Sequence, residues 1–168
     1  MNGQTRLHVG QAHELEVAKQ LERRGWAVKP WGQGLFDDNI RQALINRKDP
    51  VVYWRWIPDL IAVRGETVYL VDPKTDMRTD TPNFSIELDA FIAHNAMRAL
   101  GLHIVYVWAD LTCNTPGRLV SAGLFTPEPG RNRVATTNGS GTSFMLVRKD
   151  AQMPFDKVFG PPNQSSPT

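Results

Sequence analysis

The sequence predicts a mixed α/β domain in which helices flank a central sheet. Three observations support this prediction: a segment with helical apolar spacing near the N-terminus, two β-rich runs joined by a tight turn, and a second helical segment followed by a strand. The chain has 168 residues, of which 41% are hydrophobic and 21% are charged, as in ordinary globular proteins. This length favours one domain, expected over residues 1–160, with a disordered tail over residues 161–168.

The first element is an amphipathic helix, expected over residues 10–24. Its apolar residues recur at helical spacing, and Gly25 follows where a C-terminal cap belongs. A strand is expected to start at Trp26. Residues 30–50 are rich in loop-forming residues and are expected to form an insertion with one short helix that ends at Asn46.

A β-hairpin is expected next, because two runs of β-branched and aromatic residues, 51–63 and 67–74, flank a tight turn. Directly opposed residues in such a hairpin lie on the same face of the sheet. Pairing the two runs symmetrically around the turn places Asp59 opposite Asp72. The sequence therefore predicts two carboxylates side by side between apolar strands.

A second helix-strand unit follows the hairpin. Ser85 is expected to cap a helix over residues 86–100, Gly101 to end it, and residues 103–108 to form a strand. Toward the C-terminus we expect two further strands, at residues 118–125 and 143–148, with a loop at residues 127–142 between them.

Several classes of protein are disfavoured by the composition. The single cysteine, Cys113, excludes an internal disulfide and a cysteine-rich zinc site, so an intracellular, cytoplasmic protein is expected. No apolar run reaches the roughly 18 residues of a membrane span, and no signal peptide is evident, so we expect no membrane partner. The formal net charge of +2 permits contact with a polyanion but is far below that of a strongly basic nucleic-acid-binding protein.

The most informative feature is the pair of acids in the hairpin. Opposed Cβ atoms lie about 4.5–5.5 Å apart, which allows Asp59 and Asp72 to bind one metal ion together. Without a cation, two such charges at ~5 Å repel by about 3 kcal/mol at an effective dielectric constant of ~20. A bound divalent cation resolves this conflict.

Lys74 and Glu14 complete the candidate site. Strand alternation points Lys74 to the same face as both aspartates, where its ammonium can meet phosphate or water; the alternative is a simple salt bridge at a strand end. Glu14 shares the apolar stripe of the first helix with Val17 and Leu21, so its carboxylate is expected to face inward. The alternative is an ordinary acid near a helix start.

Three stretches carry a family resemblance: V-G-Q-A-H-E-L-E-V-A-K-Q-L-E-R-R-G-W, I-P-D-L-I-A-V and V-Y-L-V-D-P-K. With the helix-strand unit that follows, the chain resembles the PD-(D/E)XK nuclease superfamily, especially archaeal-type Holliday junction resolvases, over about residues 9–110. The resemblance implies a restriction-endonuclease-like αβββαβ core with a central mixed sheet. It also implies an active site made of Glu14, Asp59, Asp72 and Lys74.

The resemblance further implies Mg²⁺ or Mn²⁺ as the cofactor. Its ligands would be Asp59, Asp72 and the backbone carbonyl of Pro73, with Glu14 contributing directly or through a water. One departure from the family pattern is Pro73 itself, which cannot donate a ladder hydrogen bond and so requires an edge, a bulge or a strand end. Residues 30–50 are also longer than the matching link in minimal junction resolvases.

Contacts to DNA are expected from basic residues in the insertion and the loops. Tryptophans lie among them, although Trp54 and Trp56, at alternating positions of an expected strand, are more often core residues than a stacking platform. The four histidines have no zinc-site spacing and are expected to be structural. The basic candidates are Arg41, Arg47, Lys48, Arg55, Arg78, Arg131 and Arg133.

Together these features predict a magnesium-dependent DNA endonuclease, a hydrolase of phosphodiester bonds in branched or structured DNA. A Holliday junction resolvase of this kind, acting in DNA recombination, would be a homodimer so that two active sites cut two strands. A RecB-like exonuclease and a restriction-type endonuclease are alternatives of the same class. An alternative of another class is a catalytically inactive nucleic-acid-binding or assembly module, against which the complete set of acids and lysine argues.

Overall fold

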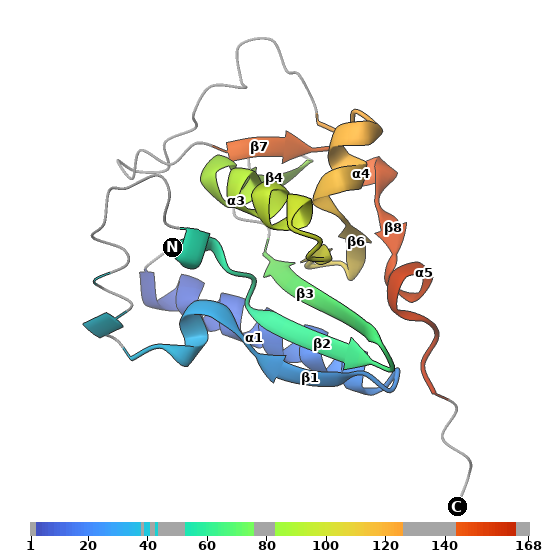
Figure 1. Cartoon of the computed structure of the whole chain (residues 1–168), viewed down its shortest axis with the longest axis horizontal. Helices are drawn as coiled ribbons and strands as arrows, with labels where there is room; N and C mark the ends of the chain where they lie inside the picture. The colour runs from blue at the N-terminus through green and yellow to red at the C-terminus, as the bar shows by residue number, and fades with distance from the viewer. Residues whose placement is uncertain are drawn as a thin grey trace, which may run out of the picture.

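The computed structural model of the chain describes residues 3–37, 39–40, 43, 53–75, 83–125 and 144–163. Its centre is a six-stranded mixed sheet in which β3 and β5 are parallel and the other neighbouring strands are antiparallel (Figure 1). In their order across the sheet the strands are β1 (Ala27–Pro30), β2 (Leu60–Arg64), β3 (Thr67–Lys74), β5 (Ile104–Trp108), β6 (Thr112–Asn114) and β8 (Met153–Pro154).

Helices and a small second sheet surround this central sheet. Along the chain α1, β1, β2, β3, α3 and β5 follow one another, so the predicted αβββαβ core is confirmed. A strand inserted before α3, β4, pairs with β7 in the second sheet. The elements outside the central sheet are α1 (Gly3–Glu22), η1 (Gly32–Leu35), η2 (Tyr53–Trp56), β4 (Phe84–Glu87), α3 (Leu88–Ala99), α4 (Pro116–Ser121), β7 (Phe144–Val147), η3 (Lys149–Ala151) and α5 (Phe155–Phe159).

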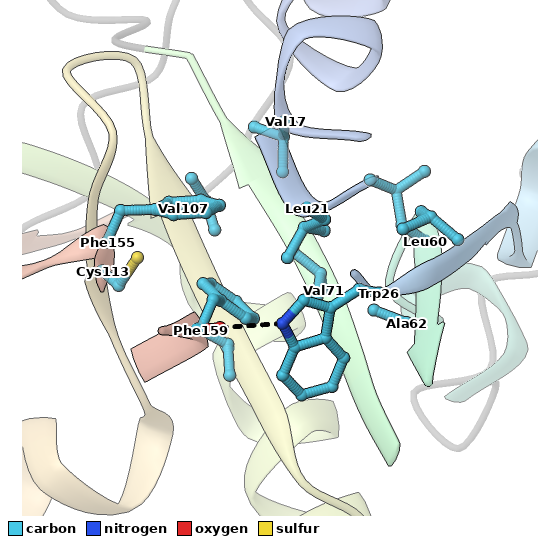
Figure 2. Packing of buried hydrophobic residues seen from close by; sticks show 12 residues of the cluster. Val17, Leu21, Trp26, Leu60, Ala62, Val71, Val107, Cys113, Phe155 and Phe159 are labelled. Atoms are coloured by element: carbon cyan, nitrogen blue, oxygen red, sulfur yellow. Dashed lines mark hydrogen bonds between the residues drawn. The ribbon is translucent and has the colours of Figure 1, made fainter. Parts of the chain in front are cut away.

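Alternating side chains of β5 separate two buried cores, as the period of a strand requires. Val107 packs in the core that Leu21 of α1 and Phe159 of α5 share (Figure 2). Its neighbour Tyr106 packs in the other core, with Phe91 of α3. The helices α1 and α5 therefore lie on one face of the sheet, and α3 lies on the other.

The hairpin pairs in the predicted register, beginning with Leu60 opposite Val71. Continued past Leu60, this register would place Pro58 opposite Pro73, and neither proline can donate a ladder hydrogen bond. Pairing between β2 and β3 therefore stops, while β3 continues to Lys74 alongside β5. The prolines thus open the hairpin at the position of the two predicted acids, and β3 has the strand end that Pro73 requires.

The first run of the hairpin is shorter than predicted. β2 begins at Leu60, and the residues Tyr53–Trp56 form the 3₁₀ helix η2. The strand predicted before Leu60 is therefore wrong for the residues that the structure describes. Pro58 supplies the physical reason, because proline has no N–H to offer a neighbouring strand.

The predicted strand over residues 118–125 is also wrong, because residues 118–121 belong to the helix α4 and Phe125 forms an isolated bridge with Val147. The Thr115 side chain accepts a hydrogen bond from the backbone N–H of Arg118, and Pro116 occupies the first turn. These are strong helix start signals, and they outweigh the apolar content of the segment.

The helix predicted over residues 86–100 begins later, at Leu88. Residues 84–87 instead pair with β7, which confirms the strand predicted near residues 143–148. Ser85 is therefore a buried strand residue rather than a helix cap.

At the N-terminus, α1 begins at Gly3, earlier than predicted, and Gly25 follows it with the expected left-handed φ of 77°. The short helix predicted to end at Asn46 lies largely outside the described residues, and the loop predicted at residues 127–142 lies wholly outside them. Among the described helices, none combines the length and the apolar character that crossing a membrane requires.

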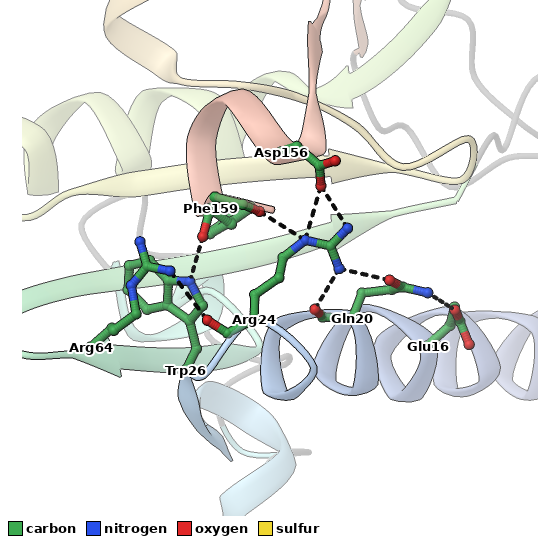
Figure 3. A network of polar contacts seen from close by, with 8 residues as sticks. Glu16, Gln20, Arg24, Trp26, Arg64, Asp156 and Phe159 are labelled. Atoms are coloured by element: carbon green, nitrogen blue, oxygen red, sulfur yellow. Dashed lines mark hydrogen bonds and ion pairs between the residues drawn. The ribbon is translucent and has the colours of Figure 1, made fainter. Parts of the chain in front are cut away.

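Hydrogen bonds join the C-terminal segment to the residues at the end of α1 (Figure 3). Arg24, which is 7% exposed, donates hydrogen bonds from Nε (3.0 Å) and Nη2 (2.6 Å) to Asp156 Oδ1 and from Nε to the Gly160 carbonyl (3.0 Å). The Trp26 indole N–H donates to the Phe159 carbonyl at 2.9 Å. Within the predicted tail, the Asn163 N–H donates to the Arg23 carbonyl at 2.9 Å, and residues 164–168 lie outside the described part of the chain.

Candidate active site

The predicted acids and lysine meet at the point where β2 and β3 separate. Asp72 lies on β3 and is 3% exposed, and Lys74 lies two residues further on the same strand. Asp59 precedes β2, and its carbonyl accepts a hydrogen bond from the Trp31 N–H at 2.6 Å, which holds it beside the end of β1. These three side chains line a cavity of about 190 Å³ together with Arg55, Trp56, Ile57, Ala90 and His94.

Asp72 is the most deeply buried member of the site. Its Oδ2 lies 2.9 Å from Lys74 Nζ and 3.7 Å from His94 Nδ1. Although the ion pair with Lys74 is close, Oδ2 has no hydrogen-bond partner of regular geometry among the described residues. Lys74 is therefore the counter-charge of this buried carboxylate.

Asp59 carries the clearest electrostatic signature of crowding. Burial, followed by the charges of Asp72 and Glu14, raises its pKa from 3.8 to about 8, and a hydrogen bond with Asp72 acts in the same direction. Lys74 opposes this rise only in part. Without a cation, the site therefore favours a proton on Asp59 at neutral pH.

The charge of Lys74 is stabilised by the acids around it. Burial alone would lower its pKa, but Asp72, with smaller contributions from Asp59 and Glu87, reverses the effect and raises it. The lysine side chain is 22% exposed, so part of it is accessible to solvent. The salt bridge that the sequence left as an alternative for Lys74 exists, and it lies inside the cavity with the acids.

Glu14 faces this group from α1. It is half-buried, while Val17 and Leu21 on the same stripe are fully buried, as the helical spacing predicted. Burial, followed by the charge of Asp72, raises the pKa of Glu14, and Lys74 lowers it. The helix thus brings a third carboxylate within electrostatic reach of the hairpin acids.

The donor set fits a hard divalent cation held by few protein ligands. No group of three or more His, Cys, Asp or Glu side chains among the described residues is arranged to hold a metal ion. Mg²⁺, however, keeps several waters and is commonly held by one or two carboxylates. Asp72 and the adjacent Asp59 are two carboxylates of this kind, and both line the cavity.

Two residues near the site were not assigned to it from the sequence. His94 is 1% exposed and lines the cavity, although the sequence led us to treat all histidines as structural. A signal was present, because His94 shares the buried stripe of α3 with Ala90 and Met97, just as Glu14 interrupts the stripe of α1. Burial also raises the pKa of Glu87, against the effect of Lys74, but this residue has no comparable sequence signal.

Of the predicted DNA-binding residues, only Arg55 lies among the described residues. It lines the cavity, and its guanidinium lies 5.0 Å from the centre of the Trp56 ring. Trp56 belongs to η2 and not to a strand, so the alternation that suggested a core role for it does not exist. The other six candidates lie outside the described residues: Arg41, Arg47, Lys48, Arg78, Arg131 and Arg133.

Other residues considered from the sequence have structural surroundings. His13 Nε2 lies 3.1 Å from the Val107 carbonyl and so ties α1 to the sheet. Cys113 is fully buried, and burial raises the pKa of its thiol well above the ordinary value, which disfavours a reactive thiolate.

Comparisons with known proteins bear on the fold. No model of a known protein family matches the chain, and no curated protein sequence matches it. Among solved structures, the chain is similar to Hjc of Archaeoglobus fulgidus, a Holliday junction resolvase from an archaeal hyperthermophile. The TM-score is 0.51 at 12% identity, covering 92% of this chain and 98% of that one. The similarity supports the predicted restriction-endonuclease-like fold class.

Proposed function

We propose that the protein is a magnesium- or manganese-dependent deoxyribonuclease with Glu14, Asp59, Asp72 and Lys74 as its active site. The observation that carries this proposal is the buried cluster of carboxylates, in which Asp72 Oδ2 has the Lys74 ammonium at 2.9 Å as its counter-charge and the pKa values of two further acids, Asp59 and Glu14, are raised. A divalent cation would relieve this crowding, because it would ligate the carboxylates and neutralise their charge.

Asp59, Asp72 and the Pro73 carbonyl would hold the cation, and Glu14 would contact it directly or through a water. When bound, Mg²⁺ or Mn²⁺ polarises a phosphodiester and lowers the pKa of a coordinated water. The separated ends of β2 and β3 leave the open side of the cavity to the DNA backbone. The products expected from this chemistry carry 5′-phosphate and 3′-hydroxyl ends.

Lys74 is suited to act on the substrate rather than on the metal. The surrounding acids keep its ammonium charged, and part of its side chain is exposed. From this position it can orient the attacking water or stabilise the negative charge that grows on the phosphate oxygens. Arg55 lines the same cavity and is proposed to contact a neighbouring phosphate.

For the substrate, we propose branched or otherwise structured DNA. The fold is similar to that of Hjc, which is a Holliday junction resolvase, but 12% identity carries no substrate specificity across. A RecB-like exonuclease or a restriction-type endonuclease would use the same site. An inactive DNA-binding module is the proposal of another class, and the presence of all four site residues argues against it.

Cleavage of labelled DNA tests these proposals together. The substrates are four-way junctions, forks, flaps, linear duplexes, single strands and closed circles, each with Mg²⁺, Mn²⁺ or EDTA. The variant is Asp72→Asn, which keeps the side-chain shape, and the control is Asp150→Asn, whose side chain is 70% exposed. Metal-dependent cutting that Asp72→Asn loses supports the nuclease. Cutting of closed circles excludes an obligate exonuclease, and folded wild-type protein that binds but cuts nothing favours the inactive module.

A junction resolvase must cut two strands, so we further propose a homodimer. An apolar groove of about 480 Å³ lies between β2, β3 and the C-terminal end of α3 and is a candidate interface. Leu100, Val68 and Leu102 line it and are 82%, 43% and 42% exposed. Large apolar side chains grouped at the surface in this way are typical of protein interfaces.

A further inference from the structure

His94 has no role in the proposed chemistry, yet it lies at the wall of the active-site cavity. Its side chain is buried on α3, and both ring nitrogens have defined neighbours. Nε2 lies 2.6 Å from the Trp56 carbonyl oxygen, and Nδ1 lies 2.9 Å from the Tyr106 hydroxyl. These two contacts determine where the proton on the ring must be.

A carbonyl oxygen can only accept a hydrogen bond, so the contact with Trp56 requires a proton on Nε2 of His94. In a neutral ring Nδ1 is then an acceptor, and it accepts from the Tyr106 hydroxyl. The two partners together select one tautomer.

This tautomer has a consequence for Asp72. Nδ1 of His94 lies 3.7 Å from Asp72 Oδ2, and a proton on Nδ1 would let the ring compete for that oxygen. With the proton on Nε2 instead, the ring presents no donor to the carboxylate. Oδ2 then has Lys74 at 2.9 Å as its charged neighbour, and the histidine ring does not compete with Lys74 or with a cation for this oxygen.

The Nε2 contact has a second consequence, for Asp59. Trp56 is the last residue of η2, and the chain reaches Asp59 three residues later. By holding the Trp56 carbonyl, His94 anchors this segment to α3 and so limits the positions open to the Asp59 carboxylate. His94, which lies on α3, therefore influences both Asp72 and Asp59.

We propose that His94 is a positioning residue of the metal site. The Trp56 carbonyl and the Tyr106 hydroxyl hold it as the Nε2–H tautomer, so that the ring does not compete for Asp72 Oδ2 and anchors the segment that carries Asp59. This inference rests on the proposed function, because it treats the two aspartates as metal ligands. A purely structural histidine would also be buried and hydrogen-bonded, so the test requires a readout other than stability. Groups that orient metal ligands typically contribute 10–100-fold to metal affinity.

Three substitutions separate the two roles. His94→Gln places an amide N–H where Nε2 lies and can still donate to Trp56, and it offers no donor at the Nδ1 position. His94→Asn reaches only the Nδ1 position and places an amide near Asp72. His94→Leu fills the space without hydrogen bonds and controls for packing. We expect Mn²⁺ affinity to remain within about 3-fold of wild type in His94→Gln and to fall about 10–100-fold in His94→Asn and His94→Leu.

The measurements are Mn²⁺ titration by electron paramagnetic resonance and thermal unfolding in EDTA, on wild type and the three variants. Weakened binding in variants that remain folded, with rescue in His94→Gln, supports the positioning role. Equal Mn²⁺ affinity in wild type and folded His94→Leu overturns it, provided that Asp72→Asn abolishes binding. If His94→Leu does not fold, the comparison is between His94→Gln and His94→Asn. An equal loss of Mn²⁺ affinity in these two folded variants overturns the role of the Trp56 contact.

The tautomer is tested without metal or DNA. In ¹⁵N spectra of the metal-free wild type at neutral pH, we expect a protonated Nε2 and an unprotonated Nδ1 for His94. A proton on Nδ1 overturns the inference whatever the activity of the protein. Failure of the proposed function looks different, because wild-type protein would then bind no Mn²⁺ and cut no DNA, and the positioning role would fall with it.

Discussion

Replacing Asp59 by asparagine should change how the stability of the metal-free protein depends on pH. In the folded protein the pKa of Asp59 is raised from 3.8 to about 8, so the folded state retains a proton that the unfolded state has lost. Between these pH values the unfolded state binds fewer protons, and stability therefore falls as pH rises. Below about pH 4 both states are protonated, and above about pH 8 both are ionised, so the effect is confined to this window.

The magnitude follows from the size of the shift. One pKa unit corresponds to about 1.4 kcal/mol, so raising the pH from 5 to 8 removes on the order of 4 kcal/mol of stability through Asp59. Asparagine has no proton to lose and keeps a similar shape. The free energy of unfolding of Asp59→Asn relative to wild type should therefore increase by roughly 1 kcal/mol for each pH unit between pH 5 and pH 8.

Urea denaturation in EDTA at pH 5, 6, 7 and 8 measures this difference, with the exposed Asp150→Asn as control. Adding Mg²⁺ at pH 8 should stabilise wild type and leave Asp59→Asn nearly unchanged, because the cation replaces the proton at the crowded carboxylates. A difference between Asp59→Asn and wild type that stays constant across the pH range would refute the reasoning.

Three further predictions concern other parts of the molecule. Lys74→Met should reduce the single-turnover cleavage rate by at least about 100-fold in protein that remains folded. Wild-type cleavage should show no alkaline loss near pH 8, because the pKa of Lys74 is raised, and such a loss would contradict this. Arg24→Met should destabilise the fold by about 2–4 kcal/mol in urea denaturation, because it removes hydrogen bonds to Asp156 and the Gly160 carbonyl. The matched variant Arg148→Met, which breaks an exposed pair, should have little effect. Leu100→Glu should convert a dimer to a monomer in size-exclusion chromatography with light scattering, with the fold intact by circular dichroism; an unchanged dimer would place the interface elsewhere.

The features of the site that depend on short-range periodicity could be predicted from the sequence. Strand alternation and the symmetric turn gave the register of the hairpin from Leu60 onward. Asp59 and Asp72 lie one position beyond the last pair, so they are not a strand pair as predicted, but both line the same cavity. Helical spacing placed Glu14 on the buried stripe of α1, and its raised pKa agrees with a position facing the acids. These results need only the periods of a strand and a helix.

The features that failed depend on signals of another kind. The prediction of a strand before Leu60 did not take account of Pro58. Proline has no N–H to donate to a neighbouring strand, and the prediction applied this constraint only to Pro73. Thr115 is a helix cap and Pro116 follows it, which together indicate a helix start. The prediction of a strand over residues 118–125 gave more weight to the apolar residues of that segment than to these two signals. Both errors come from weighing composition above backbone hydrogen bonding.

The contribution of His94 could not be predicted, because it depends on three segments meeting in space. Trp56 lies before the hairpin, His94 on α3 and Tyr106 on β5, and no spacing in the sequence relates them. The contacts of α5 with Arg24 have the same character, since they join residues more than 130 positions apart. Long-range contacts of this type require the fold itself.

The central claim is that Asp72 belongs to a metal-dependent nuclease site, and single-turnover cleavage tests it most directly. Labelled four-way junction DNA is incubated with excess wild type, Asp72→Asn or Asp150→Asn, in Mg²⁺ or EDTA. We expect 5′-phosphate products from wild type and Asp150→Asn in Mg²⁺ only, with at least a 100-fold slower rate for Asp72→Asn. Equal cleavage by wild type and folded Asp72→Asn, or cleavage that persists in EDTA, would contradict the account.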